Sequence, residues 1–420
     1  MTCMTFVRYR VVAFAVALAM VTYLDRVCIS MMAPSIMRDL GLDKQHMSYV
    51  FSAFTLAYGL FEIPTAWWAD RSGTRRVLTR IVIWWSCFTM ATAGAFSYWS
   101  LLAVRFLFGI GEAGAWPCVA RTFSRWIPVR ERGTVQGVFF MGAHLSGGLT
   151  PILVTALLQY FNWRQIFLMF GLVGFTWALA WHRWYRDDPR LHSQPGPEEV
   201  ALIEEGRPKD AASHGMDYWR KLFGNRNIWP LCVMYFGNTW CFYFCITWFP
   251  AYLSEARGFT GMKLAIMTGL PLVASALGDI FGGMVTDRMS RRHGLRIGRG
   301  GVGAAGYALA MVAMFAGAMV DDPVAASILI AIAVAACMFT LGAAWGVCID
   351  IGGNHSGVVS AAMNTAGQVG GFLSPIVVAS VVGRYHKWSA PIFLMAGLFL
   401  LGTIAWLMID PKERVFQAEA

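Results

Sequence analysis

The sequence predicts an all-α integral membrane protein, with twelve transmembrane helices in two pseudo-symmetric six-helix bundles. Hydrophobic residues make up 57% of its 420 residues. Charged residues make up only 14%, well below the roughly 25% of soluble domains. Apolar runs of about 20 residues, enough to cross a hydrocarbon core of about 30 Å, recur along the chain between short polar breaks. These observations exclude a soluble protein.

The first apolar run follows Arg8 and Arg10, as the core of a secretory signal would. It continues into Asp25 and Arg26 without a small-residue cleavage site, so we expect it to be retained as the first helix. The other runs follow in order, each bounded by polar residues. The predicted helices span residues 11–34, 47–66, 77–96, 100–124, 134–158, 163–183, 227–253, 263–285, 301–319, 324–349, 357–382 and 389–409.

A polar segment divides the predicted helices into six and six. Residues 186–225 hold four prolines and the acidic stretch 198–205, which indicate a linker with one short surface helix. The predicted domains are an N-terminal bundle (1–185), a cytoplasmic linker (186–225) and a C-terminal bundle (226–420).

The 34 lysines and arginines explain the formal net charge of +10. Most lie near the termini, in the linker or in alternate loops, at 71–80, 121–132 and 288–299. The positive-inside rule then places both termini and the linker in the cytoplasm. Topology, rather than nucleic-acid binding, accounts for the basic charge.

No motif predicts an enzyme, a metal site or a cofactor. The nine cysteines are scattered, and the nearest pair, Cys241 and Cys245, lacks the spacing of a zinc or redox site. Two Gly-x-Gly-x-x-Gly strings, at 109–114 and 298–303, follow no predicted strand, and no Walker lysine loop, His-Glu-x-x-His or Gly-x-Ser-x-Gly string occurs.

A loop motif occurs twice, half a chain apart. The run Asp70-Arg71-Ser72-Gly73-Thr74-Arg75-Arg76 follows the second helix, and Asp287-Arg288-Met-Ser-Arg291-Arg292 follows the eighth. The pair resembles the signature of the major facilitator superfamily, although Ala66 stands where that family usually has glycine. Such charges could form ion pairs that latch the two half-bundles in one state. They also serve as positive-inside anchors.

Four charged residues interrupt predicted membrane helices: Asp25, Arg26, Arg105 and Glu112. Each costs about 2.5 to 3.5 kcal/mol on insertion scales, which makes it a functional candidate. Arg105 and Glu112, seven residues apart, lie within about 20° on one helix face and about 10 Å apart. They could bracket a ligand or join the charges of the first helix, and a cavity lined by both helices is expected.

These four charges cancel when both carboxylates are ionised and leave +2 when both are protonated. Protonation and anion binding would then favour one another, which is a physical basis for proton–anion symport. The alternative is a purely structural buried network, although buried ion pairs are often poor stabilisers.

The same residues resemble the anion:cation symporter family, which includes galactonate, hexuronate and glucarate permeases and sialic acid carriers. The likeness rests on Tyr23-Leu-Asp25-Arg26, Tyr58 and the Arg105/Glu112 pair, and it extends through 126–133 and 248–253. It implies that Arg26 grips the substrate carboxylate, that Asp25 and Glu112 carry protons, and that Arg105 tunes them or helps to hold the anion.

Further polar residues could contact a substrate. In the second half, the side chains that could hydrogen-bond substrate hydroxyls, or only pack between helices, are Asn238, Tyr243, Trp345, Asn364 and Gln368. His144 could add a second titrating group or only bond a neighbouring helix. Asp279 and Asp350 are expected at the cytoplasmic ends of the eighth and tenth helices, as gating or snorkelling residues. Glycines at 142, 147, 148, 367, 370 and 371 should let helices approach closely.

The sequence therefore predicts proton-coupled uptake of a small organic anion, first a sugar acid, by alternating access around a central cavity, with no cofactor beyond the proton gradient. We expect a monomer in a bacterial inner membrane. A sulfonate, an aromatic acid or a dicarboxylate remains an alternative substrate. An exporter or anion exchanger remains an alternative mode, and a non-transporting anion receptor or intramembrane enzyme an alternative class.

Overall fold

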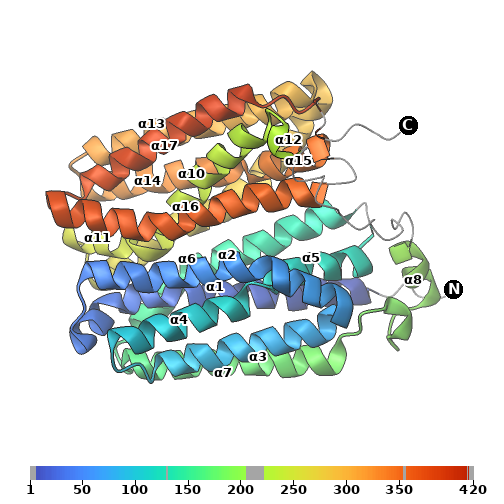
Figure 1. The fold of residues 1–420 in the computed structure, drawn as a ribbon, viewed down its shortest axis with the longest axis horizontal. Coiled ribbons are helices and arrows are strands. Elements are labelled where there is room, and N and C mark those ends of the chain that lie inside the picture. Colours follow the sequence, from blue (N-terminus) through green and yellow to red (C-terminus); the bar gives the residue numbers. More distant parts are fainter. Residues whose placement is uncertain (1–5, 129–130, 205–221, 353–355, 414, 416–420) are drawn as a thin grey trace. The chain divides into compact units, whose positions relative to one another are not determined.

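The computed structural model describes residues 6–128, 131–204, 222–352, 356–413 and 415. For residues 66, 70, 133 and 356–358 only the backbone is described. The chain divides into two compact units, Met1–Asp210 and Ala211–Ala420, which are treated separately below. All regular structure in the described ranges is helical (Figure 1).

The first unit contains six of the predicted spans. Its long helices begin and end close to the predicted limits, and the short helix predicted in the linker is confirmed as α8. The elements are α1 (Val7–Leu40), α2 (Lys44–Ser72), α3 (Thr74–Thr92), α4 (Tyr98–Glu112), α5 (Ala115–Trp126), α6 (Arg132–Leu157), α7 (Trp163–Trp184), η2 (Pro189–Leu191) and α8 (Pro197–Glu204).

The second unit contains the other six spans. Its third span begins with a short π-helix, η3. The elements are α10 (Ile228–Thr247), α11 (Phe249–Glu255), α12 (Gly261–His293), η3 (Arg296–Gly301), α13 (Val302–Met319), α14 (Pro323–Phe339), α15 (Leu341–Gly352), α16 (Ser356–Tyr385) and α17 (Ser389–Met408).

The fourth, seventh and tenth predicted spans each contain a short break that the sequence analysis did not predict, between α4 and α5, α10 and α11, and α14 and α15. Pro117 and Pro250 lack the N–H that would continue the helix across the first two breaks. At the third break, the Thr340 hydroxyl donates to the Cys337 carbonyl at 2.8 Å, a local bond that competes with the helical ladder.

The two units repeat the same pattern of helix packing. In the first, the closest pairs are α1 with α6, α2 with α4, and α3 with α7. In the second, they are α10 with α16, α12 with α14, and α13 with α17, the same pairs six spans later. Small residues permit this approach, as predicted: a Cβ on Gly370 would lie 2.5 Å from the Phe236 carbonyl oxygen of α10. Each unit is thus one copy of a single six-helix arrangement.

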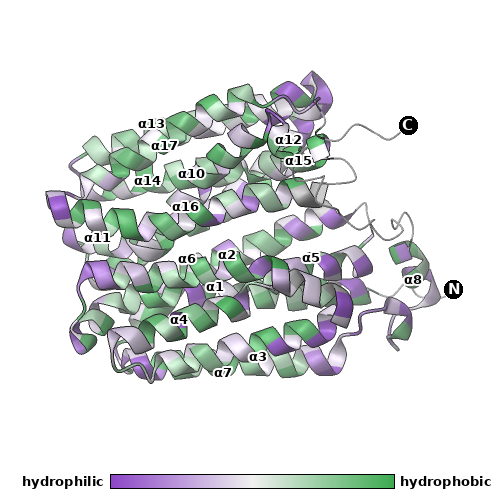
Figure 2. Ribbon diagram, in the orientation of Figure 1, coloured by the Kyte–Doolittle hydropathy of each residue, from purple (hydrophilic) through white to green (hydrophobic). Residues whose placement is uncertain are grey.

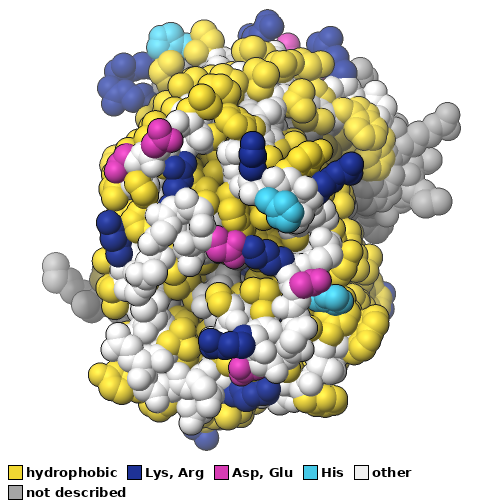
Figure 3. Space-filling view, turned by 90° about the vertical axis from the view of Figure 1, so that its left-hand side faces the viewer, with side chains coloured by type: hydrophobic (Ala, Val, Ile, Leu, Met, Phe, Trp, Pro, Cys, Tyr) yellow, Lys and Arg dark blue, Asp and Glu magenta, His cyan; other side chains and the backbone are white. Residues whose placement is uncertain are grey.

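The surface of each unit suits a membrane. Hydrophobic residues follow the middle of the helices and hydrophilic ones gather at their ends (Figure 2). At the left-hand end of Figure 1, charged side chains stand in ones and twos among apolar and uncharged surface (Figure 3). Nine of the described helical segments are long and apolar enough to cross a bilayer. With α2, α3 and α10 they make up the twelve spans.

The N-terminal end of α1 is hydrogen-bonded to α8, which lies in the predicted linker. Glu199 of α8 is fully buried and accepts hydrogen bonds from the backbone N–H groups of Val7, at 3.1 Å, and Arg8, at 3.0 Å. The Arg8 guanidinium donates to Glu199 at 3.3 Å and to Glu131 at 3.0 Å. The acidic side chain therefore caps α1 where its N–H groups lack helical partners.

Candidate functional site

The four predicted intramembrane charges are all buried in the first unit. Asp25 and Arg26 lie in the unbroken middle of α1, and Arg105 and Glu112 lie on α4. Their exposed fractions are 1%, 7%, 2% and 0%. The four charged side chains thus lie in the interior of the helix bundle, as the sequence analysis predicted.

Arg26 and Glu112 form the centre of the cluster. The Arg26 Nε donates to the Glu112 Oε2 at 2.9 Å, which joins α1 to the last residue of α4. Such a charge-assisted bond is strong in a buried setting. The structure therefore brings together the two residues that the sequence assigned to the anion and to the proton.

Four aromatic rings surround the Arg26 guanidinium. Its central carbon lies 4.9 Å from the ring centre of Tyr58, 5.2 Å from Phe54, 5.7 Å from Trp116 and 5.8 Å from Tyr23. Cation–π attraction to such rings favours this position of the guanidinium. We call these four rings the aromatic collar.

Half of the collar was missed by the sequence analysis. Phe54 precedes Tyr58 by one helical turn, and Trp116 follows Glu112 by the same spacing, a signal that could have found both. Aromatic residues make up 14% of the chain, however, so this spacing by itself selects few positions.

Asp25 and Arg105 complete the charge cluster without a direct ion pair. The two carboxylate oxygens of Asp25 are buried and have no hydrogen-bond partner among the described residues, although Arg105 and Glu112 are its electrostatic neighbours. The Arg105 guanidinium lies 4.3 Å from the ring centre of Phe108, and its Nε and Nη1 likewise lack partners among the described residues. Polar atoms buried in this way are available to a proton or a ligand.

Tyr23 and His144 also belong to the cluster. Their rings meet edge to face at 5.5 Å, and the Tyr23 ring lies 6.2 Å from that of Trp116. His144 is 2% exposed and comes from α6, the helix most closely packed on α1. All seven candidates of the first half therefore lie around one point.

The candidates in the second unit are more dispersed. The Asn238 Nδ2 donates to the Cys337 Sγ at 3.2 Å, and Tyr243 is buried against Phe242. Trp345 lies edge to face with Tyr235 at 6.4 Å. The half-buried Asn364 and Gln368 lie one turn apart on α16. For Asn238, these contacts agree with the packing alternative.

In the first loop motif, the described contacts stay within the first unit. The Asp70 side chain lies outside the part that the structure describes. Gly73 adopts φ 81° between α2 and α3, where its Cβ position also meets Asp187, so a side chain would not fit. Arg75 donates to the His182 carbonyl at the end of α7. Arg71 stacks on Trp67 at 3.9 Å, while Arg76 is exposed.

The second motif centres on Arg299, which the sequence analysis did not single out. Its guanidinium donates to Asp350 at 3.0 Å and to Asp287 at 3.3 Å, whereas Arg288 is exposed. Asp350 closes its helix as predicted. The prediction for Asp279 was wrong, because Asp279 lies inside α12, 14 residues before its last residue, His293. The helix continues through the polar motif that was expected to end it.

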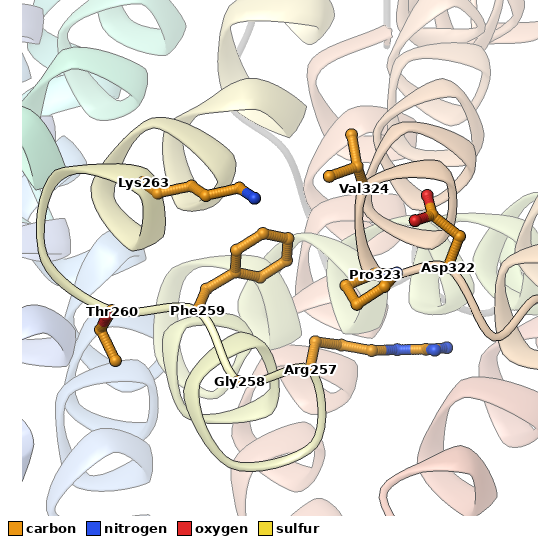
Figure 4. Close-up of a pocket in the computed structure, with 8 residues that line it drawn as sticks. All are labelled: Arg257, Gly258, Phe259, Thr260, Lys263, Asp322, Pro323 and Val324. Atoms are coloured by element: carbon orange, nitrogen blue, oxygen red, sulfur yellow. The ribbon is translucent and has the colours of Figure 1, made fainter.

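A small open pocket lies apart from these charges. It has a volume of about 240 Å³ and is lined by Arg257, Phe259, Lys263, Asp322 and their neighbours (Figure 4). The Arg257 guanidinium already donates to the carbonyls of Gly317 and Val320, and Asp322 caps α14. The pocket's polar groups thus stabilise the loops, so the buried cluster is the candidate site.

Twelve membrane spans in two like-packed units, with balanced charges buried inside the first, define a polytopic membrane transporter. The chain belongs to the Major Facilitator Superfamily, whose family model matches residues 15–375. It is 34% identical to a probable sulfoacetate transporter of Cupriavidus necator, in an alignment that covers 96% of this chain and 94% of the relative. It is 27% identical to a probable galactarate/D-glucarate transporter of Bacillus subtilis, in an alignment that covers 98% of this chain and 94% of the relative. It is also 27% identical to the hexuronate transporter of that species, with coverage of 94% and 93%. The family and these relatives are transporters, so the chain is a membrane transporter rather than an enzyme.

Solved structures agree on the fold. A crystal structure of a bacterial homolog of the human lysosomal transporter Spinster, inward-facing and unoccupied, matches with a TM-score of 0.75 and 19% identity, covering 95% of this chain and 96% of the other. The occupied form of that homolog matches with a TM-score of 0.73.

Proposed function

We propose that the protein imports a small organic anion together with protons, by alternating access in a bacterial cytoplasmic membrane. The observation that carries this proposal is the 2.9 Å bond between Arg26 and Glu112. While Glu112 is ionised, it occupies an Arg26 nitrogen that a substrate anion would use. A proton on Glu112 weakens that bond and releases the guanidinium, so proton and anion binding support one another.

Asp25 and Arg105 extend the same logic. With both carboxylates ionised, the two acids and two arginines cancel; each added proton leaves one more positive charge for an anion to neutralise. An anion that binds only the protonated cluster cannot move without the proton, which is the condition for coupled transport. The monomeric state and cytoplasmic termini belong to this proposal, the latter supported by the distribution of arginines.

A sugar acid is the first substrate candidate, because several relatives at 25% to 27% identity are named as galactarate, glucarate, hexuronate or galactonate transporters. A short sulfonate is the second, because the relative at 34% identity is named for sulfoacetate. The aromatic collar gives Arg26 apolar walls, and these suit an anion with few hydroxyls. The carboxylate of a sugar acid and the sulfonate of sulfoacetate would each bind Arg26 through two N–H donors.

The test is uptake of radiolabelled glucarate, galactonate and sulfoacetate into proteoliposomes that are acidic outside. We expect wild type to accumulate at least one of them, Arg26→Ala to take up none, and Glu112→Gln to exchange internal for external anion without accumulation. Arg80→Ala, which replaces an exposed arginine in the second turn of α3, is the matched control and should behave as wild type. Equal accumulation by all four proteins would refute the assigned roles.

A further inference from the structure

The linker contains a buried, uncharged histidine, His192. Its Nδ1 accepts a hydrogen bond from the Gln194 backbone N–H at 3.2 Å. A backbone amide can only donate, so this ring nitrogen carries no proton and the imidazole is neutral. The side chain is 9% exposed, and its Nε2 has no hydrogen-bond partner among the described residues. The proposed transport mechanism does not use this titratable group.

Two tryptophans at helix ends enclose the His192 ring. Trp126, the last residue of α5, meets it edge to face at 5.6 Å, and Trp184, the last residue of α7, does so at 4.9 Å. The Trp126 Nε1 also donates to the Arg186 carbonyl at 2.9 Å. The histidine therefore packs the linker against two helices of the first unit.

The backbone amide held by His192 belongs to a residue that joins two helix ends. The Gln194 Oε1 accepts from the Arg10 Nη1 of α1 and from the Trp184 Nε1 of α7, both at 3.2 Å. Residues 186–204 thus lie across the ends of α1, α5 and α7. We call this segment the strap.

A second proton on His192 would oppose this arrangement. On Nδ1, it would replace the hydrogen bond from Gln194 by a repulsion between two N–H donors. Burial lowers the pKa of His192 below its ordinary value, the Trp184 backbone acts in the opposite direction, and the charges of Arg186 and Arg10 add to the lowering. The docked strap therefore binds this proton less readily than a released strap.

No acid in the described part of the chain forms an ion pair with His192 that would offset this effect. Glu199 is engaged by Arg8 and by the first N–H groups of α1, and Asp188 accepts the Arg190 N–H. The charged and titratable groups on the surrounding elements are Arg8 and Arg10 on α1, Arg125 on α5, His182, Arg183, Tyr185, Arg186 and Asp187 at the end of α7, Asp188 and Arg190 at η2, and Glu198, Glu199 and Glu204 on α8.

We propose that His192 is a sensor of cytoplasmic pH, whose protonation loosens the strap from the first unit and slows transport. The strap holds α1, which carries Asp25 and Arg26, and α5, which begins three residues after Glu112. Small displacements of these helices would disturb the alignment of the charge cluster, and small misplacements in a site are costly to its activity.

This role goes beyond the proposed uptake and rests on it for the cytoplasmic placement of the linker. Imported protons enter the compartment that His192 would face, so the transporter would respond to its own product. The strap stays docked above about pH 6.5, the pKa of a released histidine. Below that pH the docking equilibrium weakens, by at most about tenfold per pH unit, until the lower pKa of the docked form is passed.

Hydrogen–deuterium exchange of the full-length protein in detergent measures the docking directly. After correction for the intrinsic exchange rate at each pH, we expect the protection of residues 186–204 in wild type to fall by about threefold to tenfold between pH 6.5 and 5.5. His192→Asn retains an acceptor atom at the δ position and cannot titrate, so its protection should stay constant. His293→Asn, which replaces an exposed histidine at the end of α12, should follow wild type. Identical profiles in wild type and His192→Asn would overturn the sensor.

The effect on transport is measured as anion exchange in proteoliposomes at equal pH on both sides. The probe is radiolabelled glucarate, galactonate or sulfoacetate, whichever wild type exchanges. We expect His192→Asn to match wild type at pH 7.5 and to exceed it by about threefold at pH 5.5. The same ratio of rates at both pH values would refute the effect on transport. Neither measurement uses a pH gradient, so a failure of wild type to accumulate anion under such a gradient would refute proton coupling and leave both tests in place.

Should His192→Asn fail to fold, wild type alone carries the test. The protection of the strap is then compared with that of α13 in the second unit, in the same samples from pH 7.5 to 5.5. A loss confined to the strap would support the sensor. Constant protection of the strap, or an equal loss in α13, would overturn it.

Discussion

The two units share a packing plan and differ in how they hold charge. In the first, two acids and two arginines are buried around the Arg26–Glu112 bond. In the second, the half-buried Asp279 lies within α12, and Arg299 lies near the helix ends, where it pairs with Asp287 and Asp350. Since the same helix pairs recur without the same charges, packing determines the fold and the charges determine the activity.

The largest expected difference concerns the two arginines. We expect Arg26→Lys to lower the kcat/KM of anion uptake by about 100-fold, because one ammonium cannot replace a planar fork that bonds Glu112 and an anion together. Arg299→Lys should lower it by less than about 3-fold, since a partly exposed ion pair contributes little. Initial uptake rates at several concentrations measure both. Equal losses would mean that the two arginines are equivalent.

The same contrast explains what the sequence could predict. A charge inside an apolar run is costly wherever it lies, so Asp25, Arg26, Arg105 and Glu112 could be assigned to the interior without a structure. Phe54 and Trp116 could not be assigned to the site in this way, because an aromatic residue in a membrane helix can pack in the core or face lipid as readily as it contacts a guanidinium.

The helix limits were harder to predict. Asp279 was assigned to a helix end because the polar motif at 287–292 begins soon after it, yet α12 runs on to His293. Arg299 went unnoticed among several basic loop residues. The breaks at Trp248 and Thr340 depend on where Pro250 and a threonine hydroxyl act on the backbone, and hydropathy does not show this.

A smaller difference is expected between the two chain ends. Glu199 is buried and accepts from two N–H groups of α1 and from Arg8, so Glu199→Gln should destabilise the first unit by about 2 kcal/mol. Glu413 pairs with Arg226 at an exposed site, and Glu413→Gln should cost less than about 0.5 kcal/mol. Denaturant unfolding of the detergent-solubilised protein distinguishes them. Similar losses would show that burial of Glu199 adds nothing.

The smallest effects concern two helix caps. The Asp43 carboxylate accepts the His46 N–H at 2.7 Å at the start of α2, and Asp322 accepts the Ala325 N–H at 2.7 Å at the start of α14. Replacing either aspartate with alanine should cost about 1 kcal/mol of stability at pH 7. Asp321→Ala, beside the second cap, should cost nothing measurable.

The Asp43 cap should also depend on pH. The hydrogen bond from the His46 backbone N–H lowers the pKa of Asp43 below its ordinary value. The folded state therefore binds this proton less readily than the unfolded state, so the stabilisation is complete above the unfolded pKa of about 3.9 and declines as the pH falls through the lower folded pKa. The stability difference between wild type and Asp43→Ala, followed by thermal unfolding from pH 7 downward, should hold to about pH 4 and then shrink. A difference that is constant to pH 2.5 would show that the carboxylate charge has no part in the cap.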